Sequence, residues 1–261
     1  MAAMSAPACA VADSEDMRDR ARFLGVDYDR LSVDDVVSEV LARPPAAPFA
    51  AIVTPNAAHL ARIAGEPDTF AGPYRRAWLC LNDSRVVAML ARSRGVDLPA
   101  APGADLVVAL FGDARLPRDA TVLLVGGDTA LFDAFVAKTG LTAASHFEAP
   151  MGLASDRNAF ERTVGFIETH PARITLLAVG SPQQEAVAEA LRSRGMARGV
   201  GLCIGAAVEF LVGRRKRAPR AMSRLGLEWL YRLTTEPRRM WRRYLIESPA
   251  VLRLYLRDLR R

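Results

Sequence analysis

The residues of this chain that could do chemistry lie in four loops, each following a short apolar run. Among them, the carboxylate of Asp83 could take a proton from a hydroxyl group. A lone carboxylate in such a loop is more typical of an Asx turn, and Thr54 and Asn56 are likewise common turn formers. The four loops are Thr54-Pro55-Asn56, Asn82-Asp83-Ser84, Gly126-Gly127-Asp128 and Gly180-Ser181-Pro182-Gln183-Gln184-Glu185.

Two of these loops have both a functional and a purely structural interpretation. Gly126 and Gly127 could bring backbone N–H groups against a diphosphate, but a glycine pair is equally typical of a tight turn. The chain has no GxGxxG or GxxxxGK[ST] pattern, which disfavours a dinucleotide dehydrogenase and a P-loop NTPase. In the last loop, Ser181 as N-cap, Pro182 at N1 and Gln184 at N3 match a capping box, and capping is the favoured local interpretation.

Neither a metal site nor a disulfide framework is expected. The histidines share no ligand spacing, and the cysteines are widely separated without a CxxC pair. Cys80 and Cys203 lie in apolar runs and are expected to be small core residues. The residues concerned are His59, His146 and His170, and Cys9, Cys80 and Cys203.

The elements that must position the four loops alternate between apolar strands and helices. Strands are predicted over residues 49–54, 78–81, 121–125 and 174–179, each followed by a helix. A short strand is also expected over 23–27, and a helix beginning at Ser32 with Asp34 and Asp35 in its first turn. Uniformly apolar strands in this alternation predict an α/β class, a parallel Rossmann-like sheet with helices on both faces. Ligands of such sheets bind beyond the carboxyl ends of the strands, where all four loops lie.

The C-terminal region, residues 214–261, differs in charge from the rest of the chain. It holds 15 Lys and Arg against four acidic residues, a local charge of +11, whereas the whole chain carries +6 and residues 1–213 therefore sum to −5. Helices are expected over 225–235, 240–246 and 250–259, with breaks at Pro237 and Pro249. In the last helix, one face is apolar and the other basic, as in a helix lying on an anionic bilayer. The apolar face holds Leu252, Tyr255, Leu256 and Leu259, and the basic face holds Arg253, Arg257 and Arg260.

The bulk properties indicate a globular protein. At 51% hydrophobic residues the chain can bury a sizeable core, and no apolar run reaches the roughly 18 residues that suggest a membrane span. Residues 1–11 lack the basic and apolar regions of a signal peptide, so a cytoplasmic location is expected. The predicted organisation is a disordered N-terminus over 1–20, an α/β core over 21–213 and a basic amphipathic helical appendage over 214–261.

Nine segments, taken in order, resemble one family over roughly residues 23–250. The sequence is similar to the WecG/TagA/CpsF bacterial glycosyltransferases, glycosyltransferase family 26. The stretch from Leu227 to Arg232 is the most specific of them. The segments are Phe23-Leu24-Gly25-Val26, Thr54-Pro55-Asn56, Asn82-Asp83-Ser84-Arg85-Val86-Val87, Pro102-Gly103-Ala104-Asp105-Leu106, Val125-Gly126-Gly127, Val179-Gly180-Ser181-Pro182-Gln183-Gln184-Glu185, Gly199-Val200-Gly201, Arg217-Ala218-Pro219 and Gly226-Leu227-Glu228-Trp229-Leu230-Tyr231-Arg232 with Glu236-Pro237.

The resemblance implies an inverting glycosyltransferase that moves a sugar from a UDP-sugar to a polyprenyl-diphosphate-linked saccharide at the inner membrane face, in the synthesis of cell-surface or exopolysaccharide. It implies Asp83 as general base, with Thr54 and Asn56 in the same site. No cofactor and no metal are expected. The residues expected to bind the donor are Gly126, Gly127, Gly180, Pro182, Gln184 and Glu185, and those expected to bind acceptor or phosphate are Arg217, Arg224 and Arg232.

Two departures and two alternatives accompany this interpretation. Many family members have Asp-Gly where this chain has Asp83-Ser84, and many have a serine where this chain has Ala104. Ser84 leaves the backbone beside the expected base with less conformational freedom than a glycine would. One alternative is a nucleic-acid-binding protein with a basic, aromatic tail, although no nucleic-acid partner is expected. The other is a catalytically inactive family member that acts as a scaffold. The sequence does not decide between a monomer and a homo-oligomer.

Overall fold

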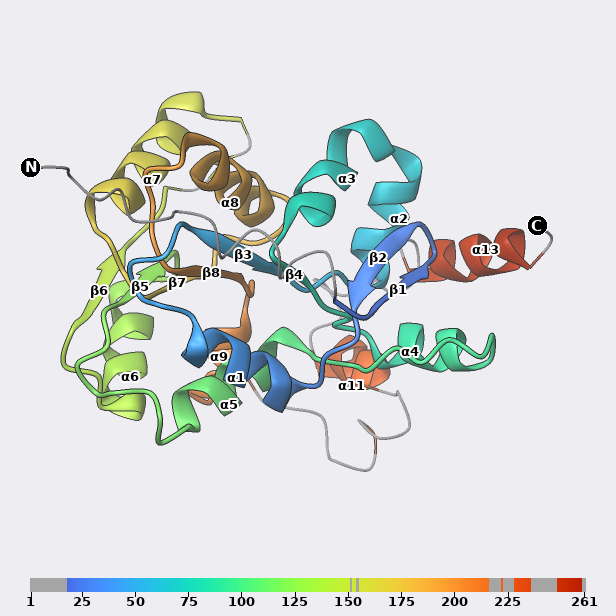
Figure 1. Cartoon of the computed structure of the whole chain (residues 1–261), viewed down its shortest axis with the longest axis horizontal. Coiled ribbons are helices and arrows are strands. Elements are labelled where there is room, and N and C mark those ends of the chain that lie inside the picture. Colours follow the sequence, from blue (N-terminus) through green and yellow to red (C-terminus); the bar gives the residue numbers. More distant parts are fainter. Residues whose placement is uncertain are drawn as a thin grey trace, which may run out of the picture.

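Parallel strands form the central sheet of the protein, in the order β4-β3-β8-β7-β5-β6 (Figure 1). The coordinates are a computed structural model, and they describe residues 18–150, 152–153, 155–215, 222, 228–235 and 248–259. Every pair of neighbouring strands in this sheet is parallel. The strands are β3 Ala50–Val53, β4 Leu79–Cys80, β5 Val122–Val125, β6 Ala144–Phe147, β7 Ile174–Leu177 and β8 Val200–Cys203.

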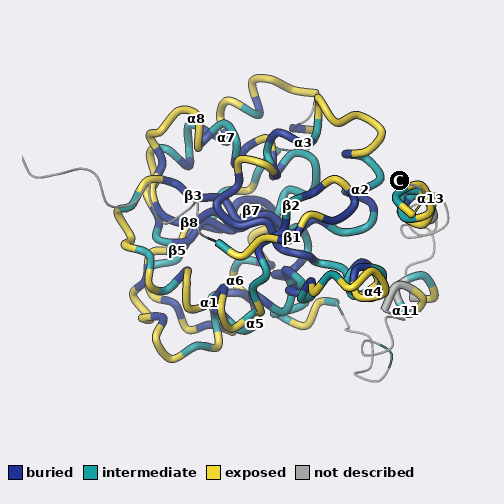
Figure 2. Tube along the Cα trace, turned by 45° about the vertical axis from the view of Figure 1, so that its right-hand side comes forward, coloured by how far each residue is buried: buried dark blue, intermediate teal, exposed yellow. Residues whose placement is uncertain are grey.

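Alternate residues of the strands pack against helices on opposite faces of the sheet. Ile52 of β3 joins a core covered by α1, α5, α6 and α9, whereas Val53 joins a core covered by α2, α3, α7 and α8. Figure 2 shows the central strands β3, β5, β7 and β8 buried along their length, whereas the helices around them alternate between buried and exposed residues. The predicted α/β class is therefore confirmed. The helices are α1 Val33–Ala42, α5 Gly103–Gly112, α6 Thr129–Thr139 and α9 Ala207–Leu211 on one face, and α2 Ala57–Gly65, α3 Pro67–Arg76, α7 Arg157–Thr169 and α8 Gln183–Arg194 on the other, with α4 Arg85–Arg92 beside them.

The N-terminal segment corrects the single strand predicted over residues 23–27. It forms an antiparallel hairpin of β1 Arg20–Phe23 and β2 Val26–Asp29. Leu24 and Gly25 make the turn with positive φ values of 49° and 83°, the conformation that tight two-residue hairpin loops require. Leucine is an unusual residue for this conformation, and the sequence pattern therefore missed the turn.

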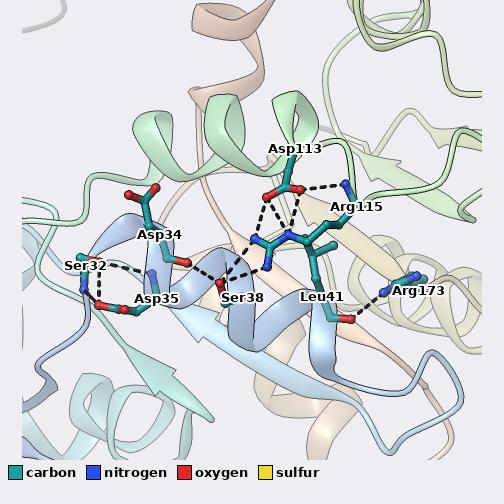
Figure 3. A network of polar contacts seen from close by, with 8 residues as sticks. All are labelled: Ser32, Asp34, Asp35, Ser38, Leu41, Asp113, Arg115 and Arg173. Atoms are coloured by element: carbon teal, nitrogen blue, oxygen red, sulfur yellow. Dashed lines mark hydrogen bonds and ion pairs between the residues drawn. The ribbon is translucent and has the colours of Figure 1, made fainter.

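Helix α1 begins as predicted, with Ser32 as its N-cap and Asp35 completing a capping box. The Asp35 backbone N–H donates to Ser32 Oγ at 3.2 Å. Further along α1, Ser38 Oγ accepts hydrogen bonds from Arg115, which is also paired with Asp113 (Figure 3). These contacts hold α1 against the loop that follows α5.

Two helices of the C-terminal region are described, α11 Glu228–Thr235 and α13 Ser248–Asp258. Helix α13 packs against α2. Val251 is buried, and Tyr255 makes a 2.7 Å hydrogen bond with Ser93 Oγ and a ring contact with Phe23. The predicted single apolar face is thus wrong in one respect, because Tyr255 packs against the core rather than lying with the exposed leucines.

Three leucines of α13 remain exposed, Leu252 by 52%, Leu256 by 48% and Leu259 by 48%. Pro249 lies in the first turn of α13, where a proline is tolerated, and does not break it. The helix predicted over 240–246 lies outside the described residues, and so do residues 1–17 of the N-terminus. Arg20, the last residue of the segment predicted to be disordered, belongs to β1. Among the described helices, none has both the length and the apolarity needed to cross a bilayer.

We expect Asp29 to be important for stability. It is 2% exposed, and its carboxylate accepts hydrogen bonds from the Cys80 backbone N–H at 2.8 Å and from Arg20 Nε at 2.9 Å. Asp29→Ala would leave the Cys80 N–H buried without an acceptor, at a cost of about 1–3 kcal/mol in the free energy of unfolding. Chemical denaturation measures this.

Asp27→Ala is the matched control on the same strand. Asp27 pairs with Arg22 on the surface, and loss of an exposed pair costs at most about 1 kcal/mol. Equal losses in the two variants would contradict the role given to Asp29.

Candidate active site

The predicted loops meet at one edge of the sheet because all its strands run in the same direction. Thr54 and Asn56 follow β3, Asp83 follows β4, and Gly126 follows β5. The loop from Gly180 follows β7, and Gly205 follows β8. The structure therefore brings together residues that are far apart in the sequence.

Asp83 is half-buried, and its carboxylate is held by groups from two other elements. Oδ1 accepts the backbone N–H of Gly103 at 2.9 Å, and Oδ2 accepts a longer hydrogen bond from Asn56 Nδ2 at 3.4 Å. Gly103 is the first residue of α5, so the carboxylate lies at the positive end of that helix. A side chain on Gly103 would place its Cβ 3.2 Å from Thr54 Oγ1. The loops after β3 and β4 and the start of α5 are therefore closely fitted around Asp83.

The Asx turn that Asp83 could have made is made by Asn82 instead. Asn82 Oδ1 accepts the Ser84 backbone N–H at 2.9 Å, and Ser84 Oγ caps α4 by accepting the Val87 N–H. The Asp83 side chain is thus not used by its own turn. It reaches across to Asn56 in the neighbouring loop.

Thr54 and Asn56 combine a turn-forming role with contacts in the site. Thr54 is 7% exposed and donates through Oγ1 to the Cys203 carbonyl at 3.4 Å. Asn56 caps α2, since its Oδ1 accepts the Ala58 N–H at 3.1 Å. Its amide nitrogen remains to contact Asp83, so helix α2 and the carboxylate are oriented by the same side chain.

The glycine pair after β5 is required by backbone geometry. Gly126 and Gly127 have φ values of 96° and 75°, which only glycine adopts readily. The next residue, Asp128, caps α6 by accepting the Leu131 N–H at 2.7 Å and is paired with Arg214 at 2.9 Å. Because a carboxylate already occupies the N-terminus of α6, the tight-turn interpretation of this loop has more support than diphosphate binding there.

The capping box predicted at the start of α8 is wrong. Pro182 occupies the N-cap position and makes no side-chain cap. Ser181 Oγ instead accepts a hydrogen bond from Arg62 at 3.1 Å. Gln184 Oε1 accepts the Gly205 N–H at 2.9 Å, and Gln184 Nε2 donates to Glu185 Oε1 at 2.9 Å. The side chain of Gln184 therefore links the end of β8 to Glu185.

Glu185 is an unusual residue in this loop because it is only 2% exposed. The side chains of Gln184 and Ser181 are hydrogen-bond donors to its carboxylate, and among the described residues its Oε2 atom is buried without a partner in good hydrogen-bond geometry. Burial raises the pKa of Glu185 above its ordinary value, although Gln184, Ser181 and Arg62 act in the opposite direction. Glu185 and Pro182 line a cavity of about 590 Å³ between α3, α7 and α8.

Sequence patterns missed several residues that the fold brings to these sites. Gly103 binds the Asp83 carboxylate through its backbone, and only its place in the Pro102-Gly103 segment of the resemblance gave any signal. Arg62 and Tyr74 lie inside helices rather than in strand-end loops. No local pattern singled them out.

The predicted phosphate-binding arginines stay predictions. Arg217 and Arg224 lie outside the described residues, as does the side chain of Arg232 in α11. At the start of the basic region, Arg214 pairs with Asp128 and Arg215 with Glu209. In the part of the chain that the structure describes, no three His, Cys, Asp or Glu side chains are grouped to hold a metal ion.

The fold and this arrangement define an α/β protein of Rossmann-like architecture whose polar residues gather at the carboxyl ends of parallel strands, the usual ligand-binding edge of such sheets. The model of the glycosyl transferase WecG/TagA/CpsF family matches residues 21–261. The chain therefore belongs to this family. It is a glycosyltransferase of cell-surface polysaccharide biosynthesis.

Glu185 predicts a measurable pH dependence of stability. Its raised pKa in the folded state means that, as pH rises above about 4.5, the unfolded chain loses its proton first and folding becomes less favourable. We expect Glu185→Gln to gain stability relative to the wild type as the pH rises above about 4.5. Denaturation at a series of pH values measures the difference.

Glu189→Gln, in the same helix, should show the opposite trend. Burial raises the pKa of Glu189, but hydrogen bonds from Arg192 and Arg76 outweigh it, and the pKa is lowered overall. Wild-type stability relative to Glu189→Gln should therefore fall with decreasing pH. Parallel pH profiles for the two variants would refute the assignment for Glu185.

Proposed function

We propose that this glycosyltransferase moves a sugar from a UDP-sugar to a polyprenyl-diphosphate-linked saccharide, with inversion at the anomeric carbon and with Asp83 as general base. The observation that carries the proposal is the position of the Asp83 carboxylate. It is half-buried at the carboxyl edge of the sheet, and it is held by Asn56 and by the N-terminus of α5. Membership of the family supports the class of reaction.

The proposed step follows from what inversion requires. The acceptor hydroxyl attacks the anomeric carbon from the side opposite to UDP, and its proton passes to a carboxylate oxygen of Asp83 as the new C–O bond forms. The bond between the anomeric carbon and the phosphate oxygen breaks, and UDP leaves with its electron pair. General-base assistance of this kind contributes about 10²–10⁴ in rate. The hydrogen bonds from Asn56 and Gly103 favour the charged form of the carboxylate, which can accept a proton.

The leaving diphosphate needs positive charge or backbone N–H donors. The N-terminus of α8, just after Gly180, has no side-chain cap, and it is a better candidate for this role than the start of α6, which Asp128 already caps. We assign the remaining stabilisation to Arg217, Arg224 and Arg232, because a guanidinium group can bind two phosphate oxygens at once. The proposal requires neither a metal ion nor another cofactor.

Asp83→Asn should lower kcat by about 10²–10⁴, because the amide keeps an oxygen for the Gly103 N–H but does not accept a proton. Turnover is measured by product mass, using a panel of UDP-sugars and a short-chain polyprenyl-diphosphate sugar. Asp97→Asn changes an exposed carboxylate and should keep wild-type turnover. If Asp83→Asn stays active, the base is another group; if the wild type makes no product from any donor, the scaffold alternative is favoured.

Helix α13 supports peripheral binding to an anionic membrane. Leu252, Leu256 and Leu259 are exposed, and Arg253 and Arg257 are exposed beside them. Each basic residue near an anionic surface contributes about 1 kcal/mol, and insertion of leucines adds apolar burial. The same surface would place the enzyme where a lipid-linked acceptor resides.

The double variant Leu252→Gln and Leu256→Gln should weaken binding to vesicles that contain anionic lipid by at least about tenfold, measured by flotation. The control is Met196→Gln, since Met196 is 68% exposed but lies after α8. Unchanged flotation of the double variant would exclude this surface. Stronger retention of the wild type by DNA than by vesicles at matched salt would favour the nucleic-acid alternative.

A further inference from the structure

Exposed apolar side chains gather on three helices at one end of the molecule. Among the described residues, eight large hydrophobic side chains are exposed, and six of them lie on or at the end of α4, α11 and α13. Figure 1 and Figure 2 both place these three helices at the same end. Single exposed apolar residues are normal, whereas a group of them on neighbouring elements marks an interaction surface. The six are Val86, Met89, Leu230, Leu252, Leu256 and Leu259.

Helix α4, which begins two residues after Asp83, is apolar on two sides. Val87 and Ala91 are buried and face the core, as the inner side of a surface helix does. On the outer side, Val86 is 38% exposed and Met89 is 58% exposed. The outer face of a helix that meets only water is polar. The outer face of α4 therefore has the character of a contact surface.

This outer face of α4 points toward α13. Ser93, the C-cap of α4, follows Val86 by seven residues and Met89 by four, so the three residues lie on one side of the helix. Ser93 Oγ is hydrogen-bonded to the Tyr255 hydroxyl of α13 at 2.7 Å. The side of α4 that carries the two exposed apolar residues is thus the side that meets α13.

The exposed leucines of α13 continue the same surface. Leu252 precedes Tyr255 by three residues and Leu259 follows it by four, so both lie on the Tyr255 side of α13. The hydrogen bond between Tyr255 and Ser93 therefore joins the apolar faces of the two helices. Together they form one surface made from two distant parts of the chain.

The charges around this surface suit an anionic partner. Five arginines and two aspartates lie on α4, on the loop after it and on α13. Arg85 and Arg94 are paired with aspartates. Arg92, Arg253 and Arg257 are exposed. Twofold contact with a second copy would set this basic surface against itself. Leucines flanked by arginines instead match an anionic bilayer.

Contact through two helices determines how the enzyme faces a bilayer. A single helix on a surface leaves the protein free to rotate about the helix axis, and contact through α4 as well removes this freedom. Asp83 lies two residues before the first residue of α4. Contact through Val86 and Met89 therefore brings the loop of the proposed base to the surface where a lipid-linked acceptor resides.

We propose that the outer face of α4, formed by Val86 and Met89, inserts into an anionic bilayer together with α13 and turns the Asp83 loop toward the membrane. The position of the acceptor rests on the function proposed above, whereas the insertion itself is independent of the reaction. The proposal adds an element of the α/β core to the membrane surface, outside the basic C-terminal region.

Two matched double variants test the surface by flotation with vesicles of phosphatidylcholine and phosphatidylglycerol. Val86→Gln with Met89→Gln removes the apolar face of α4 and should raise the Kd for vesicles about tenfold. Val108→Gln with Met196→Gln changes a valine that is 39% exposed on α5 and a methionine that is 68% exposed after α8. This control should bind as the wild type does.

Equal vesicle affinity of the two double variants would overturn the proposal. Loss of a solution dimer in the α4 variant, with unchanged vesicle affinity, would also overturn it and would assign the face to a second copy.

A fluorescent label at position 89 reports insertion directly. Cys80 and Cys203 are buried and therefore unreactive, so Met89→Cys in a Cys9→Ser background is labelled at one site. Vesicles should shift the emission of an environment-sensitive label to the blue, and brominated lipids should quench it. The control is the same label on Met196→Cys. A label at position 89 that responds no more than the control would contradict insertion, whether or not the double variant binds more weakly because of misfolding.

Failure of this surface and failure of the proposed function are distinguishable. The α4 double variant should keep wild-type turnover of a short-chain acceptor in solution, and should lose about tenfold in turnover of a long-chain acceptor held in vesicles. If the wild type makes no product while the label at position 89 inserts, only the reaction assignment fails. If Asp83→Asn abolishes turnover while vesicle binding is indifferent to the α4 face, only the surface assignment fails.

Discussion

Asp83 lies beside Asn56 because the chain segments that contain β4 and β3 run side by side in a fixed register. Strand β4 consists of Leu79 and Cys80, and the pairing continues beyond it, because the Leu81 N–H donates to the Val53 carbonyl at 2.9 Å and the Asp83 N–H donates to the Pro55 carbonyl at 3.1 Å. The buried hydrogen bond from the Cys80 N–H to Asp29 supplements that pairing from outside the main sheet. The N-terminal hairpin therefore helps to position the candidate site without entering it, since Asp83 follows three residues after Cys80.

The two carboxylates of the site region are treated differently by the fold. Asp83 receives hydrogen bonds from Asn56 and from a helix N-terminus, an environment that stabilises negative charge. Glu185 is almost completely buried, and this burial opposes negative charge more strongly than the hydrogen bonds from Gln184 and Ser181 favour it. Stability alone would favour an uncharged residue at position 185. A polar group retained at such a cost is typical of positions that serve a ligand rather than the fold.

Features determined by neighbouring residues could be predicted from the sequence, and those determined by distant contacts could not. The strand over Ile174–Leu177 follows from its continuous apolar run, and the Ser32 cap involves a partner three residues away. The Ser181 cap was predicted by the same local rule and failed, because Arg62 is 119 residues away and competes for its hydroxyl group. Asp83 was placed at the correct edge, but its partner Gly103, 20 residues further on, has no side chain to reveal it.

Helix α2 connects the outer surface of the protein to the carboxylate of Asp83. Its first turn is capped by Asn56, which also contacts Asp83, and α13 packs along it. A helix transmits displacement along its axis with little bending over so short a length. The position of α13 on the outer surface and the orientation of the Asn56 amide beside Asp83 are therefore coupled through a single helix of nine residues.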